Sequence, residues 1–251
     1  AESEGLALIL AHADRALPLL KEAYHQAEGR DKLAYAKILG MMGNSTGLET
    51  LLAAVRAADA WDKPPSYKIL SDYPDYRDVG WSMSKLDNTI VALGRTRESQ
   101  AVPVILDKLK LLGPKSPFSH YRSVALALEL IADPRAAAPL ADLLRQPTMT
   151  NHVHHSLPLP SRERVGVRGE RQVKPPTVSS PDPKQNAPAK APSELIKSTW
   201  DAATRTRAVR ELALARALFR CGDHEGLAQE ILTRYTHDLR GHFARHAKAV
   251  L

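Results

Sequence analysis

The sequence predicts an all-α fold in which about five helical hairpins stack into an α-solenoid. The apolar residues are mostly Ala and Leu, and aromatic residues make up only 5% of the 251 residues, which favours helix-on-helix packing over a β-sandwich. One amphipathic phrase with proline third also recurs, as ALPLLKEA (16–23), AVPVILDKL (101–109) and AAPLADLL (137–144). A recurring phrase predicts a recurring interface, as between stacked repeats.

The two clearest units are 86–109 and 120–144, whose prolines Pro103 and Pro139 are 36 residues apart. Each has an apolar stripe at helical spacing, a turn, and a second stripe. In the first unit, the first stripe is Leu86, Ile90 and Leu93, and the second is Val102, Ile105, Leu106 and Leu109. In the second unit, the first stripe is Tyr121, Val124, Leu128 and Ile131, and the second is Leu140, Leu143 and Leu144. Gly94 is expected to end one helix and Asp133-Pro134 to make the next turn. Each proline is expected in the first turn of the second helix, where its missing N–H costs nothing.

Two looser units are predicted at 33–55 and 214–232. In the first, the residues expected to face the core are Tyr35, Ile38 and Met42, followed by Leu48, Leu51, Leu52 and Val55. GNSTGL (43–48) and GDHEGL (222–227) match at the same offsets, which predicts sister turns. A first unit is expected to use 16–20 as its second helix, and a final helix is expected near 239–251.

Two insertions interrupt the repeats. Residues 59–84 hold five of the 13 aromatic residues, and 146–197 hold nine of the 18 prolines with few apolar residues. The second composition predicts a disordered, basic loop. The chain is therefore divided into helical repeats at 1–145, the Pro-rich insertion at 146–197, and a C-terminal repeat with a terminal helix at 198–251.

The formal net charge of +7 invites a nucleic-acid interpretation, but residues 161–190 alone carry seven Arg or Lys against three Asp or Glu. Because most of the excess lies in a segment expected to be disordered, a nucleic-acid partner is not predicted. No apolar run approaches the roughly 18–20 residues of a membrane span, so no membrane partner is predicted. A single cysteine excludes a disulfide framework and leaves the compartment open.

No catalytic residue is predicted. No metal site is predicted either. His242 and His246 are weak candidates with the i, i+4 spacing of a metal pair, but Phe243 replaces the glutamate of a zincin motif, so a basic terminal helix is expected there. The histidines of HVHH (152–155) are expected to be a solvated tract. Cys221 lacks a base and an orienting group, so a buried thiol is expected. The glycines of GMMGNSTG (40–47) do not form a dinucleotide fingerprint.

The aromatic insertion is the predicted interaction surface. Its aromatic residues are Trp61, Tyr67, Tyr73, Tyr76 and Trp81. Exposed Trp and Tyr beside charged residues suit a contact with a protein or a sugar. The alternative is that Trp61 and Trp81 pack on the repeats and hold a long loop in place, and the sequence leaves both possibilities open.

The stretches LGRTRESQAVPVIL and IADPRAAAPLADLL resemble the helix–turn–helix core of the HEAT-repeat family, including its short bacterial form. The stretches LDNTIVALGRTR, SVALALELIADPRAAAPLADLL and ELALARALFRCGDHEGLAQEILTRYTHDLRGHFARHA, with WDKPPSYK, are also similar to the C-terminal helical-repeat region of bacterial FAD-dependent oxidoreductases. In that family the flavin site lies in a separate N-terminal domain, so the resemblance implies no cofactor in this chain.

The resemblance implies a non-catalytic scaffold that is the C-terminal part of a larger FAD-dependent oxidoreductase. Its partner would be a protein or another domain of the same polypeptide. Two alternatives stay open, a stand-alone HEAT-like enzyme of the lyase kind and, less favoured, a nucleic-acid-binding solenoid. The fold by itself does not choose among them.

Overall fold

The computed structural model describes residues 9, 11–64, 82–150, 202–238 and 240–251. Regular structure in these ranges is helical and includes no strand, which confirms the predicted all-α class. The α-helices are α2 (Ala13–Gln26), α3 (Gly29–Met41), α4 (Leu48–Arg56), α5 (Lys85–Arg95), α6 (Val102–Leu109), α7 (Phe118–Ile131), α8 (Ala137–Arg145), α10 (Ala202–Arg220), α11 (Leu227–Tyr235) and α12 (Gly241–Lys248). None of these described helices is long and apolar enough to cross a lipid bilayer.

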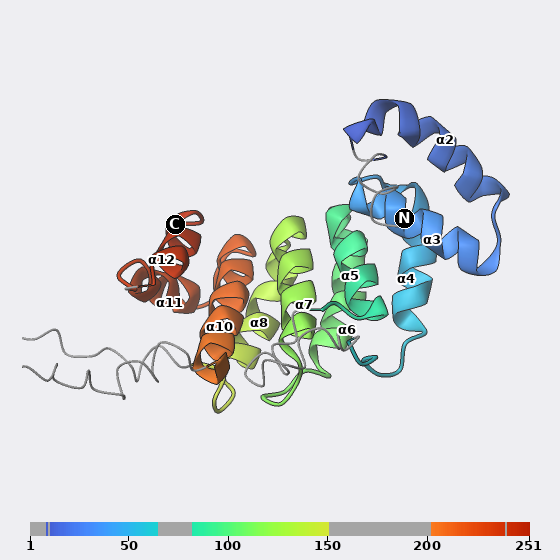
Figure 1. Ribbon diagram of the computed structural model, residues 1–251. Coiled ribbons are helices and arrows are strands. Elements are labelled where there is room, and N and C mark those ends of the chain that lie inside the picture. The colour runs from blue at the N-terminus through green and yellow to red at the C-terminus, as the bar shows by residue number, and fades with distance from the viewer. Residues whose placement is uncertain (1–8, 10, 65–81, 151–201, 239) are drawn as a thin grey trace, which may run out of the picture. The chain divides into compact units, whose positions relative to one another are not determined.

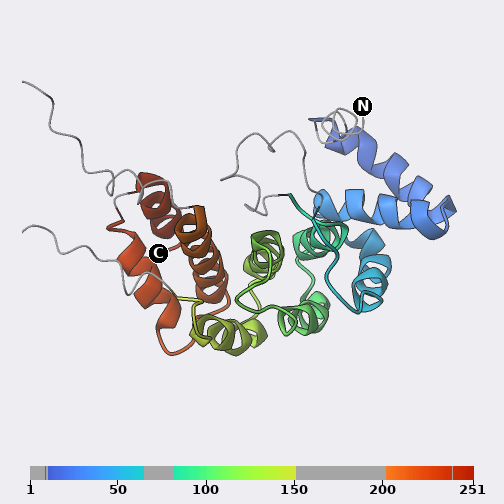
Figure 2. The same ribbon diagram turned by 60° about the horizontal axis from the view of Figure 1, so that its bottom comes forward.

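The helices between 29 and 220 lie in two adjacent rows. One row is α3, α5, α7 and α10, each packed against the next (Figure 1). The other row is α4, α6 and α8, each following its first-row helix in the chain (Figure 2). A continuous cluster of buried apolar side chains extends through both rows. At the two ends, α2 packs on α3, and α12 packs on α10 and α11.

Small residues let the first-row helices approach closely. A Cβ atom added to Gly40 of α3 would lie 2.7 Å from the carbonyl oxygen of Ala92 in α5. A Cβ atom added to Gly94 of α5 would lie 2.3 Å from the Cα atom of Ala127 in α7. Both distances are far below the roughly 3.5–4.0 Å of a favourable carbon contact. Gly94, expected to end a helix, is the last-but-one residue of α5 and sets the spacing between neighbouring helices.

The predicted turns before the second-row helices are confirmed. The side chains of Asn44 and Asp133 accept hydrogen bonds from the backbone N–H two residues later, at 3.0 and 2.9 Å. A short 3-10 turn then leads into α4 or α8. Pro103 and Pro139 lie in the first turns of α6 and α8, as predicted. Pro18 differs, because it lies in the interior of α2.

The predicted core face on the helix now described as α3 is only partly correct. Its expected members Tyr35, Ile38 and Met42 pack against the apolar core but are half-buried. The fully buried side of α3 consists of Ala36, Leu39 and Gly40. The helix α3 packs against α4 and α5 at once. Its small residues lie at the closest approaches, Gly40 against Ala92 of α5 and Ala36 against Gly47 just before α4, and Leu39 is fully buried in the core beside them.

The turns at 43–48 and 222–227 are alike in their first half only. Gly43 and Gly222 both adopt a positive φ, of 78° and 98°, which a side chain disfavours. Gly47 then has φ −90° and packs on Ala36, whereas Gly226 has φ +72°. The expected sister turns therefore share a helix end but enter the next helix differently.

Packed structure continues beyond residue 145, where the repeats were predicted to end. Met149 is fully buried, and the Tyr121 hydroxyl lies 3.9 Å from its sulfur atom. The carbonyl oxygen of Thr148 accepts a hydrogen bond of 2.7 Å from the guanidinium of Arg210 in α10. These contacts assign the residues up to Met149 to the helical body. Of the insertion predicted at 146–197, residues 151–197 lie outside the described ranges.

Replacing residues 151–197 with a linker of about ten Gly and Ser residues is expected to change the melting temperature by less than about 2 °C, because loop-closure entropy varies slowly with loop length. Replacing 146–197 with the same linker is expected to lower it by about 5 °C or more, because that deletion also removes the buried Met149 and the acceptor for Arg210. Thermal unfolding followed by circular dichroism measures both. Equal melting temperatures for the two deletions would contradict this boundary.

Candidate functional site

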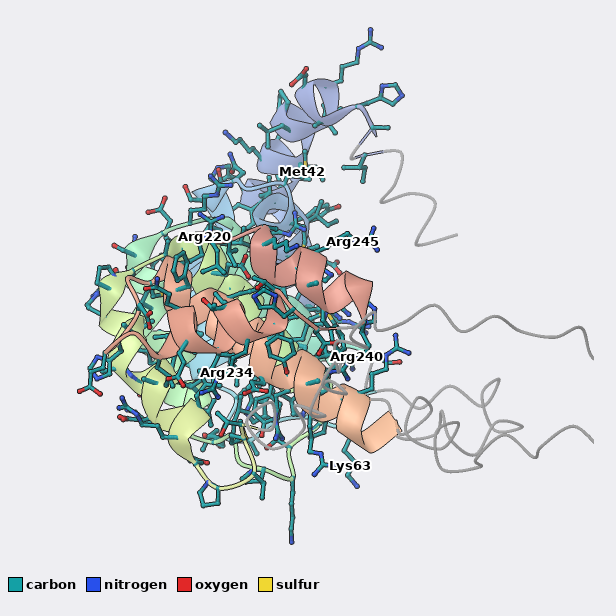
Figure 3. The ribbon with its side chains drawn as sticks, turned by 90° about the vertical axis from the view of Figure 1, so that its left-hand side faces the viewer. Met42, Lys63, Arg220, Arg234, Arg240 and Arg245 are labelled. Atoms are coloured by element: carbon teal, nitrogen blue, oxygen red, sulfur yellow. The ribbon has the colours of Figure 1, made fainter. Side chains whose placement is uncertain are left out.

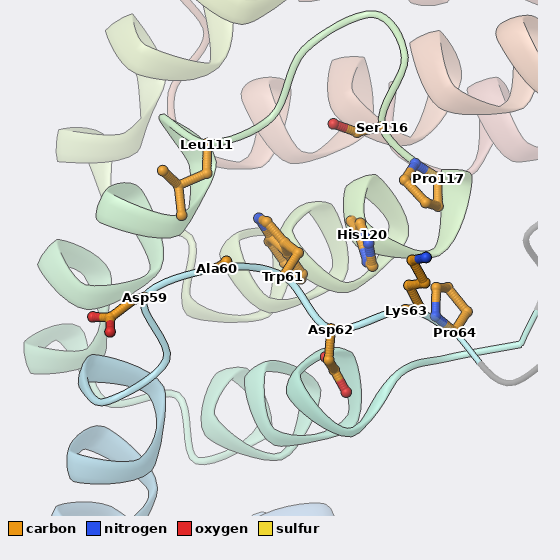
Figure 4. Close-up of a pocket in the computed structure, with 10 residues that line it drawn as sticks. All are labelled: Asp59, Ala60, Trp61, Asp62, Lys63, Pro64, Leu111, Ser116, Pro117 and His120. Atoms are coloured by element: carbon orange, nitrogen blue, oxygen red, sulfur yellow. The ribbon is translucent and has the colours of Figure 1, made fainter.

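A candidate site lies where the segment 59–64 crosses the N-terminal ends of α5 and α7 (Figure 4). Asp62 in this segment accepts hydrogen bonds from the backbone N–H groups of Lys85 and Leu86, at 2.9 and 3.2 Å. These belong to the first turn of α5, whose N–H groups have no partner inside the helix. Burial would raise the Asp62 pKa, but hydrogen bonds from Ser84 and from these N–H groups hold it below its usual value.

The helix α5 has a second acceptor at its start, the fully buried Asp87. Ser84 and Asp87 form a capping box, with Ser84 N–H donating to Asp87 at 2.8 Å and Asp87 N–H donating to the Ser84 hydroxyl at 3.1 Å. The Asp87 carboxylate also accepts hydrogen bonds from Nδ1 of His120 and from the Ser123 hydroxyl, both at 2.9 Å. One carboxylate thus links α5 to α7.

The environment of Asp87 keeps it ionised. Burial alone would raise its pKa, but the hydrogen bonds from His120, Ser84 and Ser123 and the charge of His120 outweigh burial and lower it. An ionised Asp87 fixes the orientation of His120, because Nδ1 must carry the proton that it donates. The Asp87 carboxylate therefore holds the imidazole of His120 in one orientation.

Trp61 covers this pair from the outside. Its indole ring stacks on the imidazole of His120 with a centroid distance of 4.3 Å and an interplanar angle of 24°. The Trp61 ring is half-buried, and its Nε1 atom is buried without a hydrogen-bond partner in the described structure. An unsatisfied buried donor costs about 1–3 kcal/mol, so it is uncommon in a well-packed site.

Beside Trp61 lies a pocket of about 510 Å³, within the usual size range of ligand pockets. One wall is the segment 59–64, and the other is formed by Leu111, Ser116 and Pro117 (Figure 4). His120 also lines the pocket, and Leu111 at its edge is 49% exposed. The pocket therefore combines apolar walls with a few charged groups, chiefly Asp59 and Lys63.

The arrangement is better suited to binding than to covalent chemistry. A histidine oriented by a buried carboxylate is a possible proton acceptor, but a nucleophile would also have to lie within reach of it. In the described lining, the Ser116 hydroxyl accepts a hydrogen bond from Gly113 N–H at 3.1 Å. Ser119 and Ser123 contact Nδ1 of His120 and Asp87 respectively. These hydroxyls belong to the hydrogen-bonded framework of the loop and of α7.

Of the predicted aromatic surface, only Trp61 is placed by the structure. It packs on His120, as the packing alternative proposed, and it also lines the pocket, as the binding alternative requires. The other four aromatic residues, Tyr67, Tyr73, Tyr76 and Trp81, lie outside the described ranges. The histidines at 152–155 also lie outside them.

The two histidines with metal-pair spacing, His242 and His246, are exposed on α12 in strongly cationic surroundings. His246 accepts through Nδ1 a hydrogen bond of 2.9 Å from Arg216, since a guanidinium can only donate. Burial and the nearby charges of Arg205, Arg240 and His246 lower the pKa of His242. Among the described residues, no group of three or more His, Cys, Asp or Glu side chains could hold a metal ion. The surrounding cations oppose the binding of a divalent cation at this pair.

Cys221 and the glycines at 40–47 have structural roles. Burial raises the pKa of the Cys221 thiol to about 12, and its sulfur donates to the carbonyl oxygen of Leu128 at 3.5 Å. Gly40 and Gly47 make close helix contacts, and Gly43 occupies a turn with positive φ. Each of these glycines is used by packing or by a turn, so they do not form a phosphate-binding loop.

Sequence reasoning missed Asp87 and His120. The Ser84-x-x-Asp87 spacing before an apolar run is a capping-box signal and could have identified Asp87 as a helix cap. No local signal marks His120, which is 33 residues from its partner. Only the packing of α5 against α7 brings the two side chains together.

Comparison of the chain with protein-family models, curated proteins and solved structures finds no match. The fold and the site therefore define only a structural class of protein. In its described part the chain is an all-α protein of two adjacent rows of helices, with a pocket at the N-terminal ends of α5 and α7.

Proposed function

We propose that the helices form a HEAT-like α-solenoid that serves as a non-catalytic scaffold for protein interaction. The supporting observation is the repeated contact of first-row helices, with Gly40 against Ala92 and Gly94 against Ala127. Stacked hairpins that share one type of interface are the physical basis of a solenoid. Such proteins use their extended surfaces to bind other proteins.

The pocket beside Trp61 is the proposed contact point. The indole ring of Trp61 is supported by the Asp87–His120 pair, so Trp61 can bind a partner without losing much conformational entropy. Partly buried tryptophan is the residue type most often found at the energetic centre of protein interfaces. Exposed Leu111 and the two prolines, Pro64 and Pro117, supply further apolar surface at the same place.

The proposed partner is another domain of the same polypeptide, and the larger protein is proposed to be an FAD-dependent oxidoreductase. This rests on the resemblance of residues 86–97, 123–144 and 211–247 to the helical region of that family. The described residues of this chain do not fit FAD, because its clustered glycines are occupied by helix packing and a turn. Flavin chemistry would belong wholly to the other domain.

The proposal is tested by sequencing the DNA upstream of the codon for Ala1 and expressing any preceding domain separately. Calorimetric titration of this chain into that domain is expected to give micromolar binding. Trp61→Ala is expected to weaken it by about tenfold or more, and Lys63→Glu, at the exposed edge of the pocket, to weaken it without affecting folding. Leu19→Ala removes an equally apolar side chain, 66% exposed on α2, and is the matched control.

Two results would count against this proposal. An in-frame stop codon directly upstream would refute the shared polypeptide. Binding of the preceding domain that is unaffected by Trp61→Ala and Lys63→Glu would refute the pocket as the contact point.

A further inference from the structure

The C-terminal helices carry a charge excess that the Pro-rich insertion does not account for. Residues 202–251 contain nine Arg or Lys against five Asp or Glu, together with four histidines. No acidic residue follows Asp238. The last helix, α12, therefore has only neutral and cationic side chains.

The helix α12 separates these side chains by face. Phe243 and Ala247 are buried against the preceding helices. Its outer side presents His242, Arg245, His246 and Lys248, all exposed. Figure 3, which looks onto the C-terminal helices, shows Arg240 and Arg245 on one side and Arg220 and Arg234 on the other. The four outer residues of α12 are here named the cationic face.

The carboxylates nearest to this face are already engaged. Asp238 accepts hydrogen bonds from Arg240 at 2.6 and 2.8 Å, and Glu129 accepts one from Arg216 at 2.7 Å. Arg245 and Lys248 form no ion pair with any described residue. Arg205, Arg240 and His246 are close enough to His242 to act on its titration. Within the described part of the chain, the positive charges of Arg245 and Lys248 are therefore not offset by an ion pair.

We propose that the cationic face binds the phosphodiester backbone of a nucleic acid. The phosphates of a duplex provide one negative charge per roughly 1.7 Å of helix axis, so phosphates are available to both Arg245 and Lys248, which lie about one helical turn apart on α12. Nε2 of His246 adds an N–H donor, because Nδ1 is occupied by Arg216. The face shares no residue with the Trp61 pocket, so this binding is independent of the scaffold role.

The composition of the face favours nucleic acid over the other anionic partners. A protein interface requires apolar or aromatic anchors at its centre, and the exposed residues of α12 include no large apolar side chain. An amphipathic helix that binds a membrane inserts its apolar side, whereas Phe243 and Ala247 face the helical body. The exposed side chains of α12 are cations and hydrogen-bond donors, which are the groups that bind phosphate.

Fluorescence anisotropy of a labelled duplex DNA of about 20 base pairs, titrated with the full chain at about 50 mM salt, tests the proposal. We expect a micromolar dissociation constant that weakens as salt rises. The double substitution Arg245→Gln/Lys248→Gln is expected to weaken binding by about tenfold and to reduce the slope of log K against log salt by about two. Arg15→Gln/Arg122→Gln removes the same charge from exposed positions on α2 and α7 and is the matched control.

Histidine supplies a second readout. In the free protein, burial and the neighbours Arg205, Arg240 and His246 lower the pKa of His242, and Asp238 acts in the opposite direction. A bound anion would raise the pKa of His242, so binding is accompanied by the uptake of a proton. Binding is therefore expected to strengthen as pH falls from about 7.5 to 6. The expected effect of His242→Gln is to reduce that strengthening.

Four results would overturn the proposal. They are the absence of binding at about 50 mM salt, an equal loss in the Arg15/Arg122 control, displacement of the DNA by polyglutamate at an equal concentration of charge, and preferential sedimentation with anionic phosphatidylserine vesicles. The last two would assign the face to an acidic protein segment or to a membrane. Because both double variants retain the Pro-rich insertion, its basic residues contribute equally to each.

Discussion

Replacing Gly94 with alanine is expected to lower the free energy of unfolding by about 3 kcal/mol, even though alanine is the better helix former. Helix propensity alone would favour alanine by about 1 kcal/mol. The new Cβ atom, however, would lie 2.3 Å from the Cα atom and 2.4 Å from the Cβ atom of Ala127. Since these neighbours are part of α7, the two helices must move apart, and the packing cost exceeds the gain in propensity.

Urea unfolding followed by circular dichroism measures this effect. Gly241→Ala is the matched control, because a Cβ atom at Gly241, the first residue of α12, meets nothing within 4 Å. It is expected to change the free energy of unfolding by less than about 0.5 kcal/mol. Adding Ala127→Gly to Gly94→Ala is expected to recover part of the loss. A Gly94→Ala protein as stable as the parent would show that α5 and α7 are not in this close contact.

Asp87→Asn is the second substitution with a large expected effect, a loss of about 3 kcal/mol in the free energy of unfolding. The carboxylate accepts from Ser84 N–H, His120 and Ser123. An asparagine of the same shape offers one oxygen and places N–H donors where a second acceptor is needed, so buried donors lose their partner. Asp107→Asn is the control, since the ion pair of Asp107 with Lys110 is exposed and contributes little.

The pH dependence of this difference gives a separate check. Because the pKa of Asp87 is lower in the folded state, the unfolded state takes up the proton first as pH falls below about 3.9. The stabilisation by Asp87 is therefore complete above that pH and is lost as pH approaches the folded pKa. The free energy difference between the parent and Asp87→Asn is expected to shrink below about pH 4, as measured by urea unfolding across pH. A constant difference down to about pH 2 would contradict an ionised Asp87.

The candidate site was only partly predictable from the sequence. The aromatic insertion drew attention to Trp61 because residues 59–84 hold five of the 13 aromatic residues of the chain. The support under Trp61 was not predictable, since it depends on His120 and Asp87 from two other segments. The same applies to the cationic face, because the charge in 202–251 became a surface only once α12 buried Phe243 and Ala247.

The sequence by itself determined the helical class, the turns at Asn44 and Asp133, and the position of Pro103 and Pro139 in the first turns of α6 and α8. These features depend on residues within one or two helical turns, so a local pattern is enough to specify them. The tertiary structure alone decided which side of α3 is buried, that Met149 belongs to the helical body, and that Asp87 meets His120. Those outcomes depend on how two segments far apart in the sequence pack against each other. Residues on both segments set that packing together, so neither segment encodes it alone.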